Sequence, residues 1–228
     1  MSNCIWTYLV PGERSDSNIA YNIGIQSMIE YSVKTKSDFF IHTKPMFPDL
    51  PCFYERFAVA KQVSHYKRVL VLGADVVIKN NAPNIFDEFT KGAWSLDENK
   101  AHPSTPHAYN FLQNVFSVYE INKKIDKTTP MWNGCVTLCD GKDLKTIFNC
   151  KHDNRDLWHD LSPYNANIHG SKIKVRDFGQ KYNCFVSRTE GILNIKNCHF
   201  IHFDSNTKES LIKYENYDCA IKKHPYLI

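Results

Sequence analysis

The order of strand-like and helix-like segments in the first part of the chain is what most constrains its fold. Apolar runs at residues 4–10, 38–43 and 69–78 predict three strands, the last of them interrupted by a carboxylate. Between these runs, apolar residues recur at helical spacing over 19–29 and 54–66. Strand, helix, strand, helix, strand is typical of an α/β fold, so we expect a mostly parallel central sheet flanked by helices.

The rest of the chain is less regular. Further elements are expected at 84–89 (helix), 92–96 (strand), 109–119 (helix) and 135–138 (strand). The tail after Asn206 alternates charge with isolated apolar residues and predicts no particular element. No internal repeat or long linker divides the 228 residues, so a single domain is expected.

Composition excludes several classes of protein. The chain is 43% hydrophobic and 13% aromatic, enough to bury a sizeable core, and disorder is therefore not expected. The net charge of +4 is mild and its basic residues are dispersed, which argues against a nucleic-acid partner but suits an anionic small molecule. The richness in Asn, Lys and Ile is typical of AT-rich microbial or viral genomes.

Cysteine usage and the lack of targeting signals predict a compartment. Eight cysteines occur without a secretory signal, and no window approaches the roughly 20 apolar residues of a membrane span. We therefore expect a soluble cytoplasmic protein with reduced thiols and no membrane span. Cys135, Cys139, Cys150 and His152 lack standard zinc-finger spacing, so a structural zinc ion is disfavoured.

Asp75 is the first candidate for chemistry. It follows the apolar run 69–72, and an ionised side chain is costly to bury without a partner. Ligands of open α/β sheets bind beyond the carboxyl ends of parallel strands, which is where Asp75 is expected. Its position alone fits a functional carboxylate and a turn-capping aspartate equally well.

Four sequence motifs favour a functional role for Asp75 over turn capping. They are AYNIG at 20–24, YERFAVAKQVSHYKRVLVLGADVVIKNNAPNIFD at 54–87, MWNGCVTL at 131–138, and CHFIHF at 198–203 with Lys208 downstream. In this order they resemble glycosyltransferase family 8, the group that holds glycogenin and the bacterial lipopolysaccharide galactosyltransferases. The 54–87 segment is similar to the family's aromatic-x-Arg helix, basic-apolar strand and Asp-x-Asp.

The resemblance covers about residues 4–210 and implies a GT-A fold with metal-dependent sugar transfer. The donor would be a nucleotide sugar, a UDP-sugar by preference, and the acceptor a glycan or glycoprotein. Residues 1–98 would bind the nucleotide, and residues 99–228 the sugar or acceptor. Asp75 and His202 would hold Mn²⁺ or Mg²⁺, which offsets the negative charge of the departing diphosphate.

Further donor-binding residues follow from the resemblance and from position. These are Thr7, Tyr8, Tyr21, Arg56, Ala74, Asp75, Asn133 and Lys208. Arg56 would reach the nucleotide or diphosphate, Tyr21 would stack on the base, and Lys208 would bind a phosphate oxygen. Each also has a simpler interpretation: a surface arginine, a core-packing aromatic and a solvated lysine.

The sequence departs from the family pattern at three places. Gly73 replaces the first Asp of Asp-x-Asp, and Cys135 stands where the family has Gly. The family's Asp-Gln pair is also missing. Asp97, Asp156 and Asp160 are the catalytic candidates that remain, and the last two, spaced i and i+4, would share one face if their segment is helical. Solvated surface carboxylates are the default alternative, and retention or inversion stays open.

Two other functions compete. A sugar nucleotidyltransferase has similar nucleotide-binding logic, but the loop PGERSDSN after the first strand contains only Gly12 and Arg14 of the expected glycine-rich basic sequence. A degenerate sugar-nucleotide-binding module is motivated by Gly73. A redox Rossmann enzyme is unsupported, because no Gly-x-Gly-x-x-Gly follows the first strand.

Overall fold

A six-stranded sheet forms the centre of the computed structural model, which describes residues 1–10, 18–101, 107–152, 159–186 and 195–203. Its strands, in the spatial order β2-β1-β3-β6-β5-β7, are β2 (Asp38–His42), β1 (Asn3–Tyr8), β3 (Arg68–Gly73), β6 (Trp132–Asp140), β5 (Ala93–Asp97) and β7 (Val175–Asp177). β6 runs antiparallel to both of its neighbours, while the other adjacent pairs are parallel. The expected mostly parallel α/β sheet is therefore confirmed.

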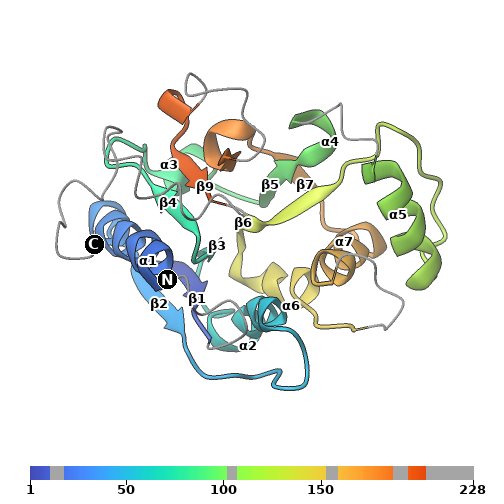
Figure 1. Cartoon of the computed structure of the whole chain (residues 1–228), viewed down its shortest axis with the longest axis horizontal. Helices are drawn as coiled ribbons and strands as arrows, with labels where there is room; N and C mark the ends of the chain where they lie inside the picture. The colour runs from blue at the N-terminus through green and yellow to red at the C-terminus, as the bar shows by residue number, and fades with distance from the viewer. Residues whose placement is uncertain (11–17, 102–106, 153–158, 187–194, 204–228) are drawn as a thin grey trace.

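Helices lie against both faces of this sheet (Figure 1). They are α1 (Asn18–Thr35), α2 (Val59–Gln62), α3 (Ile85–Glu88), α4 (Glu98–Ala101), α5 (His107–Val118), α6 (Leu144–Ile147) and α7 (Leu161–Gly170). Short 3-10 turns occur at η2 (Cys52–Ala58), η3 (Gly141–Asp143) and η4 (Gln180–Tyr182). None of the helices in the described ranges has the length and apolar character that a bilayer crossing requires.

The middle of β3, Val69–Leu72, is apolar at every residue, as expected for a strand whose two faces are both buried. Along β3, Val69 and Val71 join the core that contains α2, α6 and α7, whereas Leu70 and Leu72 join the core that contains α1 and α3. This alternation follows the two-residue period of a strand. The continuous apolar run therefore reflects two cores, one on each side.

A second, three-stranded sheet explains why an apolar run contains a carboxylate. Its strands, in the spatial order β4-β9-β8, are β4 (Val76–Ile78), β9 (Phe200–His202) and β8 (Cys184–Phe185). The single strand expected over 69–78 is thus wrong, because β3 ends at Gly73 and the chain enters the second sheet at Val76. Asp75 lies in the turn between the two sheets, so it is not a charge inside a strand.

The helix expected over 54–66 is also only partly present. The structure has the 3-10 turn η2 followed by a single α-helical turn, α2. Two consecutive charges on η2 are buried, Glu55 against His42 at 2.9 Å and Arg56 against Asp160 at 2.8 Å. We attribute the tighter winding to these tertiary contacts, which override the helical spacing of the apolar residues. The elements expected at 84–89, 92–96, 109–119 and 135–138 are found as α3, β5, α5 and part of β6.

Gly24 lets α1 approach the turn that carries Asp75. A Cβ atom at residue 24 would lie 2.1 Å from the carbonyl oxygen of Ala74 and 3.0 Å from that of Val76. One turn along α1, Ser27 accepts a hydrogen bond from the amide of Ile78 at 3.0 Å. The helix is therefore packed main chain to main chain against this turn, where no side chain can yield.

We expect Gly24→Ala to lower the free energy of unfolding by about 3 kcal/mol or more, because overpacking against backbone cannot be relieved by a rotamer change. Denaturant unfolding monitored by circular dichroism would measure the change. Gly170→Ala is the matched control, since a Cβ there would meet no atom within 4 Å. It should be neutral or slightly stabilising, and equal effects of the two variants would contradict the close approach.

Candidate functional site

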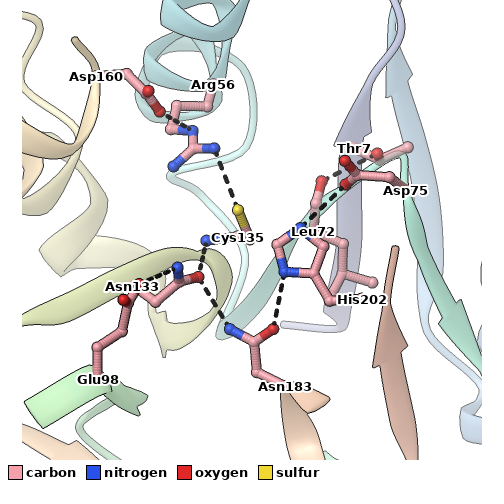
Figure 2. A network of polar contacts seen from close by, with 10 residues as sticks. All are labelled: Thr7, Arg56, Leu72, Asp75, Glu98, Asn133, Cys135, Asp160, Asn183 and His202. Carbon is pink, nitrogen blue, oxygen red and sulfur yellow. Dashed lines mark hydrogen bonds and ion pairs between the residues drawn. The ribbon is translucent and has the colours of Figure 1, made fainter. Parts of the chain in front are cut away.

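Polar side chains gather beyond the ends of β1 and β3 (Figure 2). Tyr8, the last residue of β1, is paired in register with Gly73, the last residue of β3. Parallel neighbouring strands end at the same edge of a sheet, and this is the edge at which open α/β folds bind ligands. The turn after Gly73, the end of β9 and the start of β6 all meet here.

Asp75 and His202 face each other at this edge. The two side chains point toward each other (Figure 2), and Oδ1 of Asp75 lies 3.6 Å from Nε2 of His202. The backbone sets this meeting, because β4 pairs with β9 so that Val76 is opposite His202, and the amide of Phe203 donates to the Asp75 carbonyl at 3.0 Å. The Asp75 side chain is 18% exposed, so the pair is open to a ligand from the carboxylate side.

Gly73 leaves room for that carboxylate. A Cβ atom at residue 73 would lie 2.7 Å from Oδ1 of Asp75. The side chain of the second acidic position thus folds back over the place where the family pattern has its first aspartate. Relative to that pattern, Gly at residue 73 leaves one carboxylate fewer at this turn.

The residues present fit a divalent cation that is completed by substrate. One carboxylate oxygen and one imidazole nitrogen are ligands that Mn²⁺ accepts, and Mg²⁺ is commonly held by one or two carboxylates together with substrate phosphates. Within the described ranges, no three His, Cys, Asp or Glu side chains cluster as an ion site. An ion at Asp75 and His202 would therefore need oxygen ligands from a bound diphosphate.

Arg56 occupies a second charged position at the same edge. Its Nε lies 2.8 Å from Oδ2 of Asp160, and its Nη2 lies 3.7 Å from the sulfur of Cys135. Arg56 is 5% exposed and Asp160 8% exposed. Burial raises the pKa of the nearby Tyr8 hydroxyl, while the positive charge of Arg56 opposes that rise. The surface-arginine alternative is excluded by this burial.

A distortion in β6 makes room for the guanidinium. Opposite β5, Thr137 pairs with Ser95 but Asn133 already pairs with Leu96, so the register shifts between these two pairs. Such irregularities are frequent beside active sites, where they redirect side chains. Gly134 lies within the shifted segment, and a Cβ there would be 2.5 Å from Nη1 of Arg56. Gly134 thus leaves space for the guanidinium of Arg56, and the sulfur of the next residue, Cys135, contacts it.

Asn133 and Asp97 are buried where the start of β6 pairs with the end of β5. Asn133 is 3% exposed and donates from Nδ2 to Oε1 of Glu98 at 2.6 Å. Asp97 accepts hydrogen bonds from the amides of Met131, at 3.2 Å, and Asn99, at 3.1 Å. Burial raises the pKa of the Asp97 carboxyl group, and these two hydrogen bonds partly counteract it.

The other candidate residues are placed as follows. Thr7 is fully buried, and its hydroxyl donates to the carbonyl of Leu72 at 3.0 Å, so its side chain ties β1 to β3. Ala74 is 6% exposed in the turn before Asp75. Tyr21 is half-buried on α1. Asp156 and Lys208 lie outside the described residues, and their roles stay predictions.

Two polar residues of this region were missed in the sequence. Asn183 precedes β8 and contacts both Asn133 and His202, at 2.9 Å and 3.2 Å. Glu98 begins α4, directly after Asp97. No local pattern distinguishes Asn183, because its partners come from distant strands. A buried acidic neighbour of Asp97 could have been suspected from the consecutive carboxylates Asp97-Glu98.

Comparison with known proteins identifies the fold through similar solved structures. No family model and no curated protein matches the sequence. Among solved structures, a glycosyltransferase involved in the glycosylation of the major capsid of PBCV-1 superposes with a TM-score of 0.61 at 12% identity, covering 95% of this chain and 99% of that one. The galactosyltransferase LgtC, in complex with donor and acceptor sugar analogs, gives 0.55 at 11% identity, covering 93% and 95%.

The chain has the GT-A glycosyltransferase fold. The bifunctional glycosyltransferase WbbM shares it too, with a TM-score of 0.58 at 9% identity over 90% of this chain and 46% of that one. The GT-A fold expected from the resemblance to glycosyltransferase family 8 is thereby confirmed. In an α/β fold of this kind, the edge that carries Asp75 and His202 is where a ligand is expected.

Proposed function

We propose that the chain is a glycosyltransferase that moves a sugar from a nucleotide-sugar donor, by preference a UDP-sugar, to a glycan or glycoprotein acceptor. The observation that carries the proposal is the meeting of Asp75 with His202 at the ligand-binding edge of a GT-A fold. Both groups are cation ligands by chemistry, and they come from segments far apart in the sequence.

Asp75 and His202 would hold Mn²⁺ or Mg²⁺ against the donor diphosphate. When bound, the cation would offset the negative charge that builds on the departing nucleoside diphosphate. The nucleotide would lie over the ends of β1 and β3, near Tyr8 and Ala74. The sugar would lie toward Asn133 and Cys135.

Arg56 would bring a guanidinium to the donor sugar or diphosphate, held in place by Asp160. A carboxylate that is ion-paired with arginine is a weak base, since the positive charge favours its ionised form. The pairing therefore supports a positioning role for Asp160 more than proton abstraction from the acceptor. Asp97 accepts hydrogen bonds from the amides of Met131 and Asn99, so it would help to order the segments that precede β6 and follow β5.

A donor screen tests the proposal. Purified protein would be incubated with a panel of UDP- and GDP-sugars, with and without Mn²⁺, and release of the nucleoside diphosphate measured. We expect Mn²⁺-dependent hydrolysis of one UDP-sugar above the others. Calorimetry with UDP, with and without Mn²⁺, separates the alternatives: metal-dependent UDP binding without hydrolysis of any donor would support a binding module instead.

We also propose that the protein acts in the cytoplasm. The cysteines in the described part of the chain are free thiols, several of them buried, which suits a reducing compartment. Cell fractionation with a tagged chain would test this location.

A further inference from the structure

The imidazole of His202 is held by an amide on the side away from Asp75. Its Nδ1 lies 3.2 Å from Oδ1 of Asn183, a residue with no exposed surface. A terminal amide can be assigned in either of two orientations, so its other contacts must decide whether it presents oxygen or NH₂ to the ring. Here those contacts are unambiguous.

The orientation is fixed from the main chain outward. The amide N–H of Cys135 donates to Oδ1 of Asn133 at 2.9 Å, and a backbone N–H can only donate. The Nδ2 group of Asn133 donates to Glu98 at 2.6 Å. Because Oδ1 of Asn133 is an acceptor, Asn183 must donate to it through Nδ2, at 2.9 Å. Oδ1 of Asn183 therefore faces His202, and only a ring N–H can satisfy it.

We propose that Glu98, Asn133 and Asn183 are positioning residues that keep a proton on Nδ1 of His202, so that the ring, when it is neutral, has its lone pair on Nε2. This leaves the lone pair of Nε2 on the side of Asp75, at 3.6 Å. In a neutral imidazole, the hydrogen bond made by one ring nitrogen determines which of the two nitrogens carries the proton. The inference rests on the proposed function only for what Nε2 binds, a divalent cation.

The burial and charge of Glu98, Asn133 and Asn183 favour the proton on Nδ1 of His202. Glu98 is 4% exposed, Asn133 3% and Asn183 0%, so bulk water does not compete for their hydrogen bonds. A carboxylate at the far end makes the first bond charge-assisted, and neighbouring bonds in a buried chain reinforce one another. Partners of this kind behind a metal-binding histidine typically affect metal affinity by about 10- to 100-fold.

The tautomer is directly measurable without metal. Long-range ¹H–¹⁵N correlation spectra of the metal-free protein at about pH 9, above the ordinary imidazole pKa of about 6.5, distinguish Nδ1–H from Nε2–H rings. The His202 signals would be assigned by their loss in His202→Gln. We expect Nδ1–H in the wild type, and a mixture dominated by Nε2–H in Asn183→Leu. An Nε2–H ring in the wild type would overturn the proposal.

Metal affinity gives the second measurement. Mn²⁺ would be titrated in the presence of UDP and the free ion followed by electron paramagnetic resonance. Asn183→Leu should weaken Mn²⁺ binding by about 10- to 100-fold. Asn183→Asp keeps an acceptor for the Nδ1 proton, so it should retain the tautomer and recover part of the affinity. A loss in Asn183→Asp as large as in Asn183→Leu would contradict the proposal.

Asn167→Leu is the matched control for a merely structural loss. Asn167 is 7% exposed and donates from Nδ2 to the carbonyls of Ile147 and Asn149, at 3.1 Å and 2.7 Å. Its replacement should lower stability but leave the His202 tautomer and Mn²⁺ affinity unchanged. Equal effects of both leucine variants on the tautomer would refute the positioning role.

The two proposals fail in different ways. If no donor is hydrolysed and Mn²⁺ does not bind, the proposed function fails, while the tautomer in the wild type and in Asn183→Leu still decides the role of the three residues. If Mn²⁺-dependent hydrolysis is found with an Nε2–H ring, the proposed function stands and the positioning inference is wrong.

Discussion

Asp75→Ala should lower Mn²⁺-dependent hydrolysis of the donor sugar by at least about 100-fold, and His202→Ala by a comparable factor. The reason is that, in the described part of the chain, each would supply one of the two proposed side-chain ligands, which face each other at 3.6 Å. Loss of either leaves the cation held by one side chain and the diphosphate, and loss of transition-state charge stabilisation costs several kcal/mol. Initial rates across a Mn²⁺ titration would measure the effect.

Two surface variants control for charge and size. Asp49 and His65 are exposed, so Asp49→Ala and His65→Ala make the same chemical changes away from the site. Both should retain full turnover. Circular dichroism would show that the Asp75 and His202 variants remain folded. Full Mn²⁺-dependent turnover in both site variants would show that the ligand assignment is wrong.

The largest effect on stability is expected at the ion pair of Arg56 and Asp160. Asp160→Ala leaves a guanidinium that is 5% exposed without its carboxylate, and breaking a buried pair in this way typically costs about 3–5 kcal/mol. Urea unfolding at equilibrium would measure the free energy change. A variant in which both residues become apolar, Arg56→Met with Asp160→Leu, should recover much of that loss because no unpaired charge remains buried.

An ion pair whose lysine is exposed to solvent supplies the comparison. Lys100 contacts Asp177 at 3.3 Å, and its side chain is 73% exposed. Lys100→Ala should change stability by about 1 kcal/mol or less, as exposed ion pairs usually contribute little. If Asp160→Ala is as mild as Lys100→Ala, the guanidinium must reach water, and Arg56 would not be a buried charge.

The parts of the fold that the sequence predicted are those encoded locally. Residues 4–10 and 69–72 have the continuous apolar character of strands buried on both faces, and this pattern needs no knowledge of distant partners. The split after Gly73 was missed because the apolar residues of both strands read as one run. Only the pairing of Val76–Ile78 with Phe200–His202, far along the chain, separates them.

In the candidate site too, some residues were predicted from the sequence and others depend on contacts between distant segments. Asp75 and His202 were expected to meet on the strength of motif order, and the structure brings them together. The partners behind them were not foreseen. Asn183, Glu98 and the pairing of Arg56 with Asp160 depend on which strands lie side by side, and the hydrophobic pattern of a single segment carries no such information.

The register of β4 against β9 also bears on how the protein is made. Asp75 is synthesised well before His202, which belongs to β9, the last strand in chain order in the described part of the chain. Pairings between distant segments form late, because the chain between them must first be ordered. During translation the nascent polypeptide can therefore complete the β1-α1-β2 unit well before Asp75 and His202 can meet at the proposed cation site. Competence for chemistry should arise as one of the last events of folding.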